Sequence, residues 1–330
     1  MIVAGRNGTA VLLACAACAA SLPLWAEPYT LQLASTALVL AMFALSLQLL
    51  VGGTGLVSLG HAAFFGIGAY AVHLMEAFGP SPSILLTLPA AILLAGLAAL
   101  IVGALALRTS GFFFLMTTLA FGQMLFFLFH DTPLGGGADG VFVGRPALSA
   151  LGFEYAVGRR DRPTVMLLLN LGILLAMYGG LATLLRTMFG RALLGIRANE
   201  HRMRSMGFDT YSLKLGSFVA AGSLAGVAGH MAAMTEAFVT PELLGWHHSA
   251  EALLAILLGG LGALHGPILG AVAYVGLGEA AQSITERQRL VEGVVILLVV
   301  LVLPRGLTGL RLRAPRLPGL RLPAAKRAKP

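Results

Sequence analysis

Long apolar runs separated by short polar segments dominate the sequence. Seven of these runs carry almost no charged residue: 9–25, 29–51, 59–75, 83–107, 111–130, 164–185 and 213–234. Because a helix needs about 20 apolar residues to cross a bilayer, each run predicts a membrane-spanning helix. Three shorter runs, 249–264, 267–281 and 290–303, each contain a glutamate and could be tilted or re-entrant. The pattern predicts an all-α polytopic membrane protein with eight to ten spanning helices, and we prefer ten.

Composition excludes a soluble globular protein. Hydrophobic residues make up 58% of the chain and charged residues 11%, whereas soluble domains carry about 25% charged residues. No stretch is polar enough to form a second, soluble domain. We therefore predict one transmembrane domain over residues 1–310 and a basic cytoplasmic tail over residues 311–330. The formal net charge of +8 comes from short loops and the tail, which indicates topology signals and not a nucleic-acid-binding surface.

The distribution of basic residues predicts the orientation. Lysine and arginine concentrate on the cytoplasmic side of membrane proteins. In a ten-span arrangement with the N-terminus inside, 16 of the 22 basic residues fall in cytoplasmic segments. This predicts that both termini are cytoplasmic and that residues 131–163 lie outside. Run 9–25 could instead be a cleaved secretory signal, but a retained helix is favoured because run 29–51 must begin on the outer side.

Residues with catalytic or ion-coupling chemistry are sparse. An ion-coupled carrier usually needs ionisable groups near the middle of the membrane. The candidates are His61, His230, His265 and Glu279. An enzyme would need a catalytic set, and the nearest approach is His247, His248 and Glu251, in which His247 and Glu251 have the i, i+4 spacing of metal ligands on one helix face. No third ligand is evident, so we predict neither a metal site nor an enzymatic activity.

The strongest local signal is the cytoplasmic segment 190–207, GRALLGIRANEHRMRSMG. Its spacing predicts a single amphipathic helix with Leu193, Ile196, Met203 and Met206 on one side. Gly207 suits the left-handed position that ends a helix. Such a basic helix either lies on lipid headgroups or docks its apolar side into a groove on a cytoplasmic partner. The residues of the segment alone do not separate these two readings.

Four further stretches accompany this segment in collinear order. They are LLVGGTGLVSLGHAAFFGIGAYAV at 49–72, FFFLMTTLAFGQM at 112–124, FVTPELLGWHHSAEALLAILLGGLGALHGPILGA at 238–271 and LPRGLTGL at 303–310. Together with residues 190–231 they resemble the permeases of bacterial branched-chain amino acid ABC transporters, specifically the M-type subunit that pairs with an H-type subunit. The resemblance runs from about residue 30 to residue 310 and implies the ABC importer permease fold.

The resemblance implies that segment 190–207 is a coupling loop that meets an ATPase subunit. It assigns to that contact Gly190, Arg191, Ala192, Leu193, Arg197, Glu200 and Gly207, to which the apolar stripe adds Met203. Glu200 is followed by His201 and Arg202, where the importer loop of the family has two small residues. This departure affects individual contacts and not the placement of the loop.

The resemblance also implies the partners. They are a sister permease of the H type, two ATPase subunits and a periplasmic solute-binding protein. The chain contains no G-x-x-x-x-G-K-[ST] phosphate-binding loop. ATP and magnesium are therefore expected on the ATPase subunits, and no cofactor is expected on this chain, a multi-pass protein of the bacterial inner membrane.

Two glycine-rich segments, 52–55 and 259–262, are candidates for the transport pathway. Each is followed by a histidine, and the residues beyond the two histidines agree in spacing, which indicates a degenerate parallel repeat. The candidate pathway or packing residues are Gly52, Gly53, Gly55, His61, Gly259, Gly260, Gly262 and His265. Clustered glycines would let backbone groups line an uncharged path, whereas the alternative is that they only let helices pack closely.

The sequence thus predicts the permease subunit of an ATP-driven importer for branched-chain or other hydrophobic amino acids, and not an enzyme. One alternative keeps the architecture and changes the cargo to urea, short amides or other amino acids. A second alternative is a stand-alone ion-coupled carrier. The sequence does not fix the cargo, because the resemblance implies that specificity lies largely with the binding protein.

Overall fold

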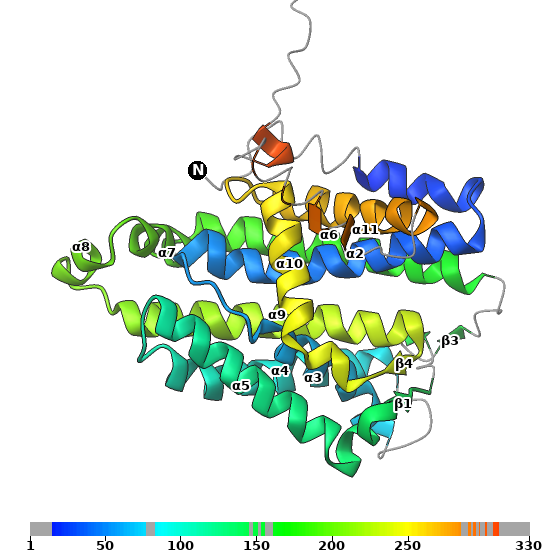
Figure 1. Cartoon of the computed structure of the whole chain (residues 1–330), viewed down its shortest axis with the longest axis horizontal. Helices are drawn as coiled ribbons and strands as arrows, with labels where there is room; N and C mark the ends of the chain where they lie inside the picture. Colours follow the sequence, from blue (N-terminus) through cyan, green and yellow to red (C-terminus); the bar gives the residue numbers. More distant parts are fainter. Residues whose placement is uncertain are drawn as a thin grey trace, which may run out of the picture.

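The computed structural model describes residues 15–76, 83–144, 148–150, 153–155, 161–284 and 306–309, together with isolated positions between 290 and 301. This part of the chain is helical apart from two short antiparallel ladders (Figure 1). The long elements are α2 (Pro28–Gln48), α3 (His61–Glu76), α4 (Ile84–Ala106), α5 (Phe112–His130), α6 (Arg162–Arg186), α7 (Met188–Ala198), α9 (Thr210–Glu236), α10 (Trp246–Gly259) and α11 (Gly266–Ile284).

Shorter elements connect these helices. They are η1 (Leu22–Leu24), the π-helical turn η2 (Leu49–Thr54), η3 (Pro133–Gly135), η4 (Gly137–Asp139), α8 (Glu200–Ser205), η5 (Pro241–Leu244) and η6 (Leu307–Gly309). Strand β1 (Val141–Phe142) pairs with β4 (Phe238–Val239), and β2 (Leu148–Ala150) pairs with β3 (Phe153–Tyr155). The chain from Cys15 to Leu24 is also helical.

Five helices in the described part of the chain are long and apolar enough to cross a membrane. They are Pro28–Thr54, Ile84–Ala106, Phe112–His130, Arg162–Arg186 and Thr210–Glu236, and each coincides with a run that predicts a span. This confirms the all-helical membrane architecture. Run 9–25 is described only from Cys15 onward, and run 290–303 lies mostly outside the described residues, so the count of ten remains a prediction.

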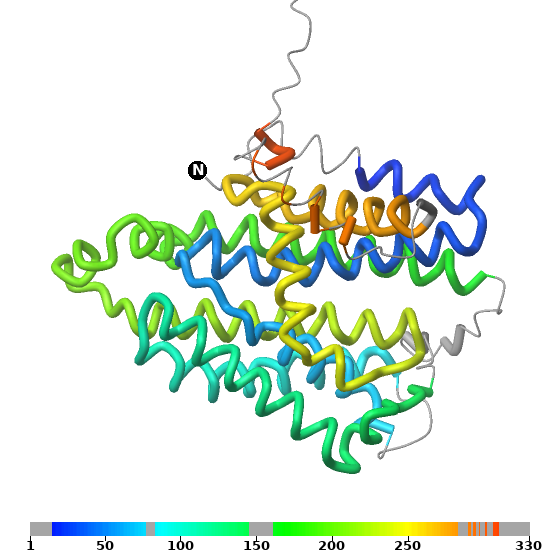
Figure 2. Tube along the Cα trace, in the orientation of Figure 1, coloured from blue at the N-terminus to red at the C-terminus, as the bar shows by residue number. Residues whose placement is uncertain are grey.

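Two predicted spans differ from simple crossings. The chain leaves η2 as an extended segment that runs along the molecule before α3 begins at His61 (Figure 2), so α3 is 16 residues long and shorter than the roughly 20 residues of a full span. Helix α10 is 14 residues long, and it runs across α2 and α9 instead of along them (Figure 1). Run 249–264 is therefore not a simple membrane crossing. The sequence had left this open, because the run is short enough to be tilted or re-entrant.

Small residues set the packing at the centre of the fold. On α9, a Cβ atom added at Gly229 would lie 1.8 Å from the Phe65 carbonyl oxygen, and one added at Gly226 would lie 2.5 Å from the Ala95 side chain. Only glycine permits this approach of α9 to α3 and α4, the arrangement by which membrane helices gain van der Waals contact. The most apolar 18-residue window of α9 is 72% buried, compared with 22% for α5, so α5 lies at the periphery.

Polar contacts identify which helix ends meet. Tyr211, at the start of α9, donates to the carbonyl of Ala104 near the end of α4. At the opposite end, Arg162 donates to the carbonyl of Met234, and Glu76 accepts from the backbone N–H of Gly144. Segment 190–207 therefore lies at one end of the helices and the described residues of the predicted outer loop 131–163 lie at the other, as the predicted orientation requires.

Candidate coupling site and glycine-rich segments

Segment 190–207 forms two helices, so the prediction of one continuous helix is wrong. Helix α7 ends at Ala198, and Asn199 has extended backbone angles, φ −165° and ψ 100°. Its side-chain oxygen accepts a hydrogen bond from the backbone N–H of Arg202 at 2.9 Å, which caps the first turn of α8. Asparagine favours this capping position over a helix interior. The chain therefore breaks into two helices at Asn199, although the spacing of the apolar residues predicts one.

The break changes which side chains share a face. Leu193, Ile196 and Met203 are buried, with at most 9% exposed, but Met206 is 65% exposed. The prediction that Met206 belongs to the same stripe is therefore wrong. Leu193 belongs to the main core, whereas Ile196 and Met203 pack with Ala192 against Leu213. These buried side chains stabilise the loop within the chain and do not present a surface to another protein.

Gly207 has the predicted role at the end of α8. Its φ is +85°, the left-handed conformation that glycine adopts without strain. The N–H of Gly207 donates to the Arg204 carbonyl, and the N–H of Phe208 donates to the Met203 carbonyl, which is the hydrogen-bond pattern of a Schellman motif. The motif leaves Phe208 41% exposed, next to Met206.

Glu200 ties α8 to α9. Its two carboxylate oxygens accept hydrogen bonds from Arg204 at 2.7 Å and from Lys214 at 2.5 Å, and Thr210 donates a third at 3.3 Å. Partial burial opposes ionisation of Glu200, but the hydrogen bonds and positive charges of Lys214 and Arg204 outweigh it and hold its pKa below the usual value. The carboxylate is thus fully engaged inside the chain.

Arg197 connects the predicted coupling loop to the first glycine-rich segment. Its Nη1 donates to the Gly52 carbonyl at 2.6 Å, in the π-helical turn that extends α2. Carbonyls at a helix C-terminus lack intrahelical partners, and a basic side chain satisfies them. A Cβ atom added at Gly53 would lie 3.9 Å from Leu193, and Gly55, at φ +78°, lies against the Arg197 side chain. Two sequence candidates 145 residues apart therefore form one site.

The turn from α6 to α7 holds the other predicted loop residues. Thr187 caps α7 by accepting a hydrogen bond from the N–H of Gly190. A Cβ atom added at Gly190 would lie 2.4 Å from the Cα of Leu185, so this glycine permits a tight turn. Arg191 is exposed. Of the residues that the sequence assigns to coupling, Arg191 thus points outward, whereas Gly190 and Ala192 are buried.

The second glycine-rich segment forms the turn between α10 and α11. A Cβ atom added at Gly259 would lie 1.8 Å from the Gly266 carbonyl oxygen, and Gly260 adopts φ +109°, whereas Gly262 has open space around it. Gln48, at the end of α2, donates to the Leu261 carbonyl at 3.1 Å. This buried glutamine, which the sequence analysis missed, links the turn to α2 one helical turn before Gly52.

The two repeat histidines occupy similar places with different surroundings. His61 begins α3, is fully buried, and its Nε2 lies 2.9 Å from the Ser46 hydroxyl. His265 immediately precedes α11 and is only partly buried, and the Nδ1 atoms of both histidines have no hydrogen-bond partner within the described residues. Both helices run toward the same end of the molecule, because Glu76 near the end of α3 reaches Gly144 and Glu279 on α11 reaches Tyr29.

The i, i+4 spacing of His247 and Glu251, noted in the sequence, does not correspond to the contact that forms. It is His248 whose Nδ1 lies 2.9 Å from Glu251, at i, i+3 spacing, whereas the ring of His247 lies against that of Trp246. No cluster of three or more histidine, cysteine, aspartate or glutamate residues that could hold a metal ion occurs in the described part of the chain. Glu242 and Tyr274, which share a cleft with this pair, were not identified from the sequence.

These features define a polytopic helical membrane protein in which the loop at one end is bonded to the end of α2. The family described as branched-chain amino acid transport system, permease component, matches residues 29–303. The chain belongs to this family. It is an inner-membrane transport permease and not an enzyme, and membership implies ATPase and binding-protein partners.

Two curated relatives are similar over nearly the whole chain. The high-affinity branched-chain amino acid transport system permease protein LivM of Escherichia coli (strain K12) is 29% identical over 314 residues, which covers 90% of this chain and 74% of that protein. LivM of Salmonella typhimurium (strain LT2) is 28% identical over the same coverage. No solved structure matches this chain.

Proposed function

We propose that this chain is the M-type permease subunit of an ATP-driven importer for branched-chain amino acids in a bacterial inner membrane. Its partners would be an H-type sister permease, two ATPase subunits and a periplasmic solute-binding protein. The observation that carries the proposal is the bond from Arg197 on α7 to the Gly52 carbonyl at the end of α2. It joins a projecting loop to the most buried spanning helix.

The loop formed by α7 and α8 projects from the spanning helices and is firmly attached to α2. Helices α7 and α8 extend beyond the ends of the spanning helices (Figure 1), where a soluble ATPase could reach them. Leu193 packs in the main core and Arg197 binds the end of α2, so a displacement of α7 would be transmitted to α2 without an intervening flexible segment. ATP binding on the partner subunits would drive this displacement and switch the permease pair between its outward-open and inward-open states.

The surface that would face the ATPase differs from the stripe predicted from the sequence. Three large apolar side chains around α7 and α8 are exposed: Met188 at 78%, Met206 at 65% and Phe208 at 41%. Arg191 and Arg202 are exposed beside them. Apolar anchors within a rim of arginines are typical of protein interfaces. The contact would therefore form through these residues.

The orientation follows from the same assignment. The ten-span arrangement has both termini and α7–α8 in the cytoplasm, with residues 131–163 in the periplasm. A cysteine introduced at Ser149 should then react with a membrane-impermeant thiol reagent in intact cells, and one at Ala325 should not. Labelling at residue 325 with protection at residue 149 would reverse the orientation.

Co-purification tests the coupling surface. The double substitution Met206→Ala with Phe208→Ala should remove ATPase subunits from the purified complex and abolish leucine uptake, while the sister permease stays bound. A matched control is Phe113→Ala with Met124→Ala, which removes the same side-chain types from the exposed face of α5. Retained ATPase binding and normal uptake in the first variant would contradict the proposed contact.

Reconstitution of the chain alone separates this function from that of an ion-coupled carrier. Proteoliposomes that contain only this chain should take up no leucine on an imposed proton or sodium gradient, because the energy source is ATP on a separate subunit. Gradient-driven uptake by the chain alone would contradict the proposal.

A further inference from the structure

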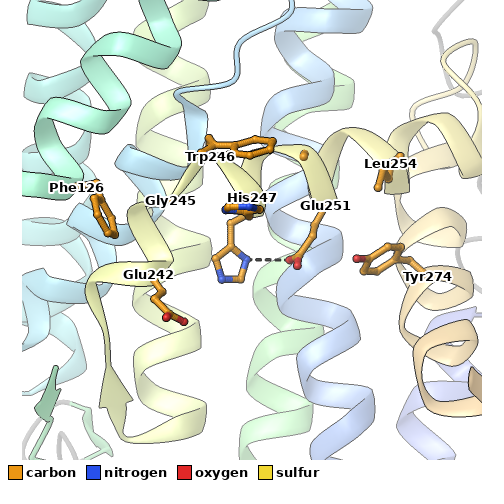
Figure 3. A pocket seen from close by; sticks show the side chains of 10 residues that line it. Phe126, Glu242, Gly245, Trp246, His247, Glu251, Leu254 and Tyr274 are labelled. Carbon is orange, nitrogen blue, oxygen red and sulfur yellow. Dashed lines mark ion pairs between the residues drawn. The ribbon is translucent and has the colours of Figure 1, made fainter. Parts of the chain in front are cut away.

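A cleft of about 610 Å³ lies between α5, α10 and α11 and takes no part in the coupling loop. Phe126 of α5 forms one wall, Tyr274 of α11 and Leu254 of α10 form the opposite wall, and Glu242 and Glu251 lie between them (Figure 3). Ligand-binding pockets typically have volumes of about 300–1,000 Å³. The cleft therefore has room for a molecule the size of an amino acid together with water.

The cleft lies within the thickness of the membrane. Near the start of α10, Ser249 accepts a hydrogen bond from the N–H of Ala62, and the adjacent His61 contacts Ser46. Ser46 precedes the end of the span Pro28–Thr54 by eight residues, or about 12 Å at the helical rise. On the other side, Phe126 is four residues from the outer end of α5. The cleft thus extends from mid-depth toward the periplasmic side.

Placing the ionisable side chains of the cleft at this depth in the membrane is unfavourable in free energy unless they are compensated. An ionised group in contact with hydrocarbon costs several kcal/mol, so such groups face water, a polar partner or a ligand. His248 and Glu251 compensate each other at 2.9 Å. The Glu242 carboxylate is exposed and accepts no hydrogen bond from any described residue. It interacts electrostatically with His248, but no described residue donates a hydrogen bond to it, so its oxygens can accept hydrogen bonds from a ligand in the cleft.

The rest of the lining suits a zwitterion with an apolar side chain. Carboxylates bind an ammonium group through charge-assisted hydrogen bonds. The first turn of α10, which includes Trp246 and His247 in the lining, has no side-chain cap, and uncapped N–H groups favour a carboxylate. Phe126 and Leu254 provide apolar surface on opposite sides. Each part of a hydrophobic amino acid thus has a complementary group.

We propose that this cleft holds an α-amino acid with an apolar side chain during its passage, with the ammonium group bound by Glu242 and Glu251 and the side chain placed between Phe126 and Leu254. This assignment rests on the proposed function. The cleft would receive the amino acid from the periplasmic side, and the sister permease would cover its open side.

The test uses the complete importer in proteoliposomes, with leucine-loaded binding protein and ATP. Glu242→Gln is the primary variant, because this carboxylate has no hydrogen bond whose loss could disturb the fold. Loss of a charge-assisted hydrogen bond should reduce the rate of leucine uptake about tenfold. ATP hydrolysis stimulated by the binding protein should persist, because the coupling loop is intact. Asp139→Asn, which removes an exposed carboxylate at the same end of the molecule, is the matched control and should transport normally.

Three results would overturn the assignment. The first is unchanged uptake both in Glu242→Gln and in the double variant Glu242→Gln with Glu251→Gln. The second is a loss of stimulated ATP hydrolysis as large as the loss of uptake. The third is loss of the sister permease from the purified variant complex. The last would identify the cleft as a subunit contact only. Absence of leucine uptake by the assembled wild-type importer would instead contradict the proposed function, before any variant is compared.

Discussion

The end of the molecule that carries α7 and α8, here called the coupling end, differs from the α10 cleft in how its charged side chains are bonded. At the coupling end, Glu200 is bonded to Arg204 and Lys214, and Arg197 is bonded to a backbone carbonyl. In the cleft, Glu242 interacts electrostatically with His248 but accepts no hydrogen bond from the described residues. Hydrogen bonds that are complete within the chain keep α7 and α8 in a fixed geometry when an external force acts on them. A carboxylate that accepts no hydrogen bond from the protein can bind a ligand. The two regions are therefore suited to transmission and to recognition, respectively.

The largest expected effect comes from breaking the transmitting contact. Arg197→Ala removes the donor to the Gly52 carbonyl and should reduce ATP-driven uptake at least about tenfold, since a hydrogen bond to a charged group contributes about 1.5–3 kcal/mol. ATPase binding should persist, because the exposed surface of α7–α8 is unchanged. Uptake and co-purification measured on the same membranes check this.

Arg191→Ala is the control for that variant. Arg191 lies on the same helix, carries the same charge and is exposed like Arg197, but among the described residues it makes no hydrogen bond to the end of α2. If the two variants lose uptake equally, the Arg197–Gly52 bond has no special role, and the two arginines contribute only positive charge.

A smaller effect should separate two glycines of the α10–α11 turn. Gly260→Ala forces a side chain into φ +109° and should lower the free energy of unfolding by about 1–3 kcal/mol. Gly262→Ala enters open space and should be neutral within about 0.5 kcal/mol. The melting temperatures of the purified complexes report both values. Equal shifts would indicate that backbone conformation does not determine the need for glycine here.

The smallest effect concerns the ion pairs of the coupling end. Because its pKa in the folded chain is lowered, Glu200 contributes stability above the pKa of a glutamate in the unfolded chain, and this contribution is lost as the pH falls through the lowered value. Solvent screening limits it to about 0.5–1 kcal/mol. Glu200→Gln should therefore lower the melting temperature at pH 7, and by less as the pH falls below the pKa of a glutamate in the unfolded chain. A constant difference across this range would show that the charge of Glu200 is not responsible.

The sequence predicted features that depend on local pattern. Apolar runs located the spanning helices because hydropathy reflects burial in lipid, and Gly207 was identified because a left-handed helix end favours glycine. Asn199 was missed because one capping residue outweighs a periodic stripe. The course of α10 was missed because hydropathy carries no information about direction. The bond from Arg197 to Gly52 joins residues 145 positions apart, and no local pattern reports such a contact.

The most direct test of transmission fixes α7 to the end of α2. In a chain with Cys15 and Cys18 replaced by serine, Gly53→Cys and Leu193→Cys would introduce thiols at positions whose side chains adjoin, to be joined by a short reversible thiol crosslinker. If α7 and the end of α2 move as one unit, the crosslinked importer should retain ATP-driven leucine uptake equal to that of its reduced form. Loss of uptake on crosslinking, with recovery on reduction, would show that this contact opens during transport and would contradict the account.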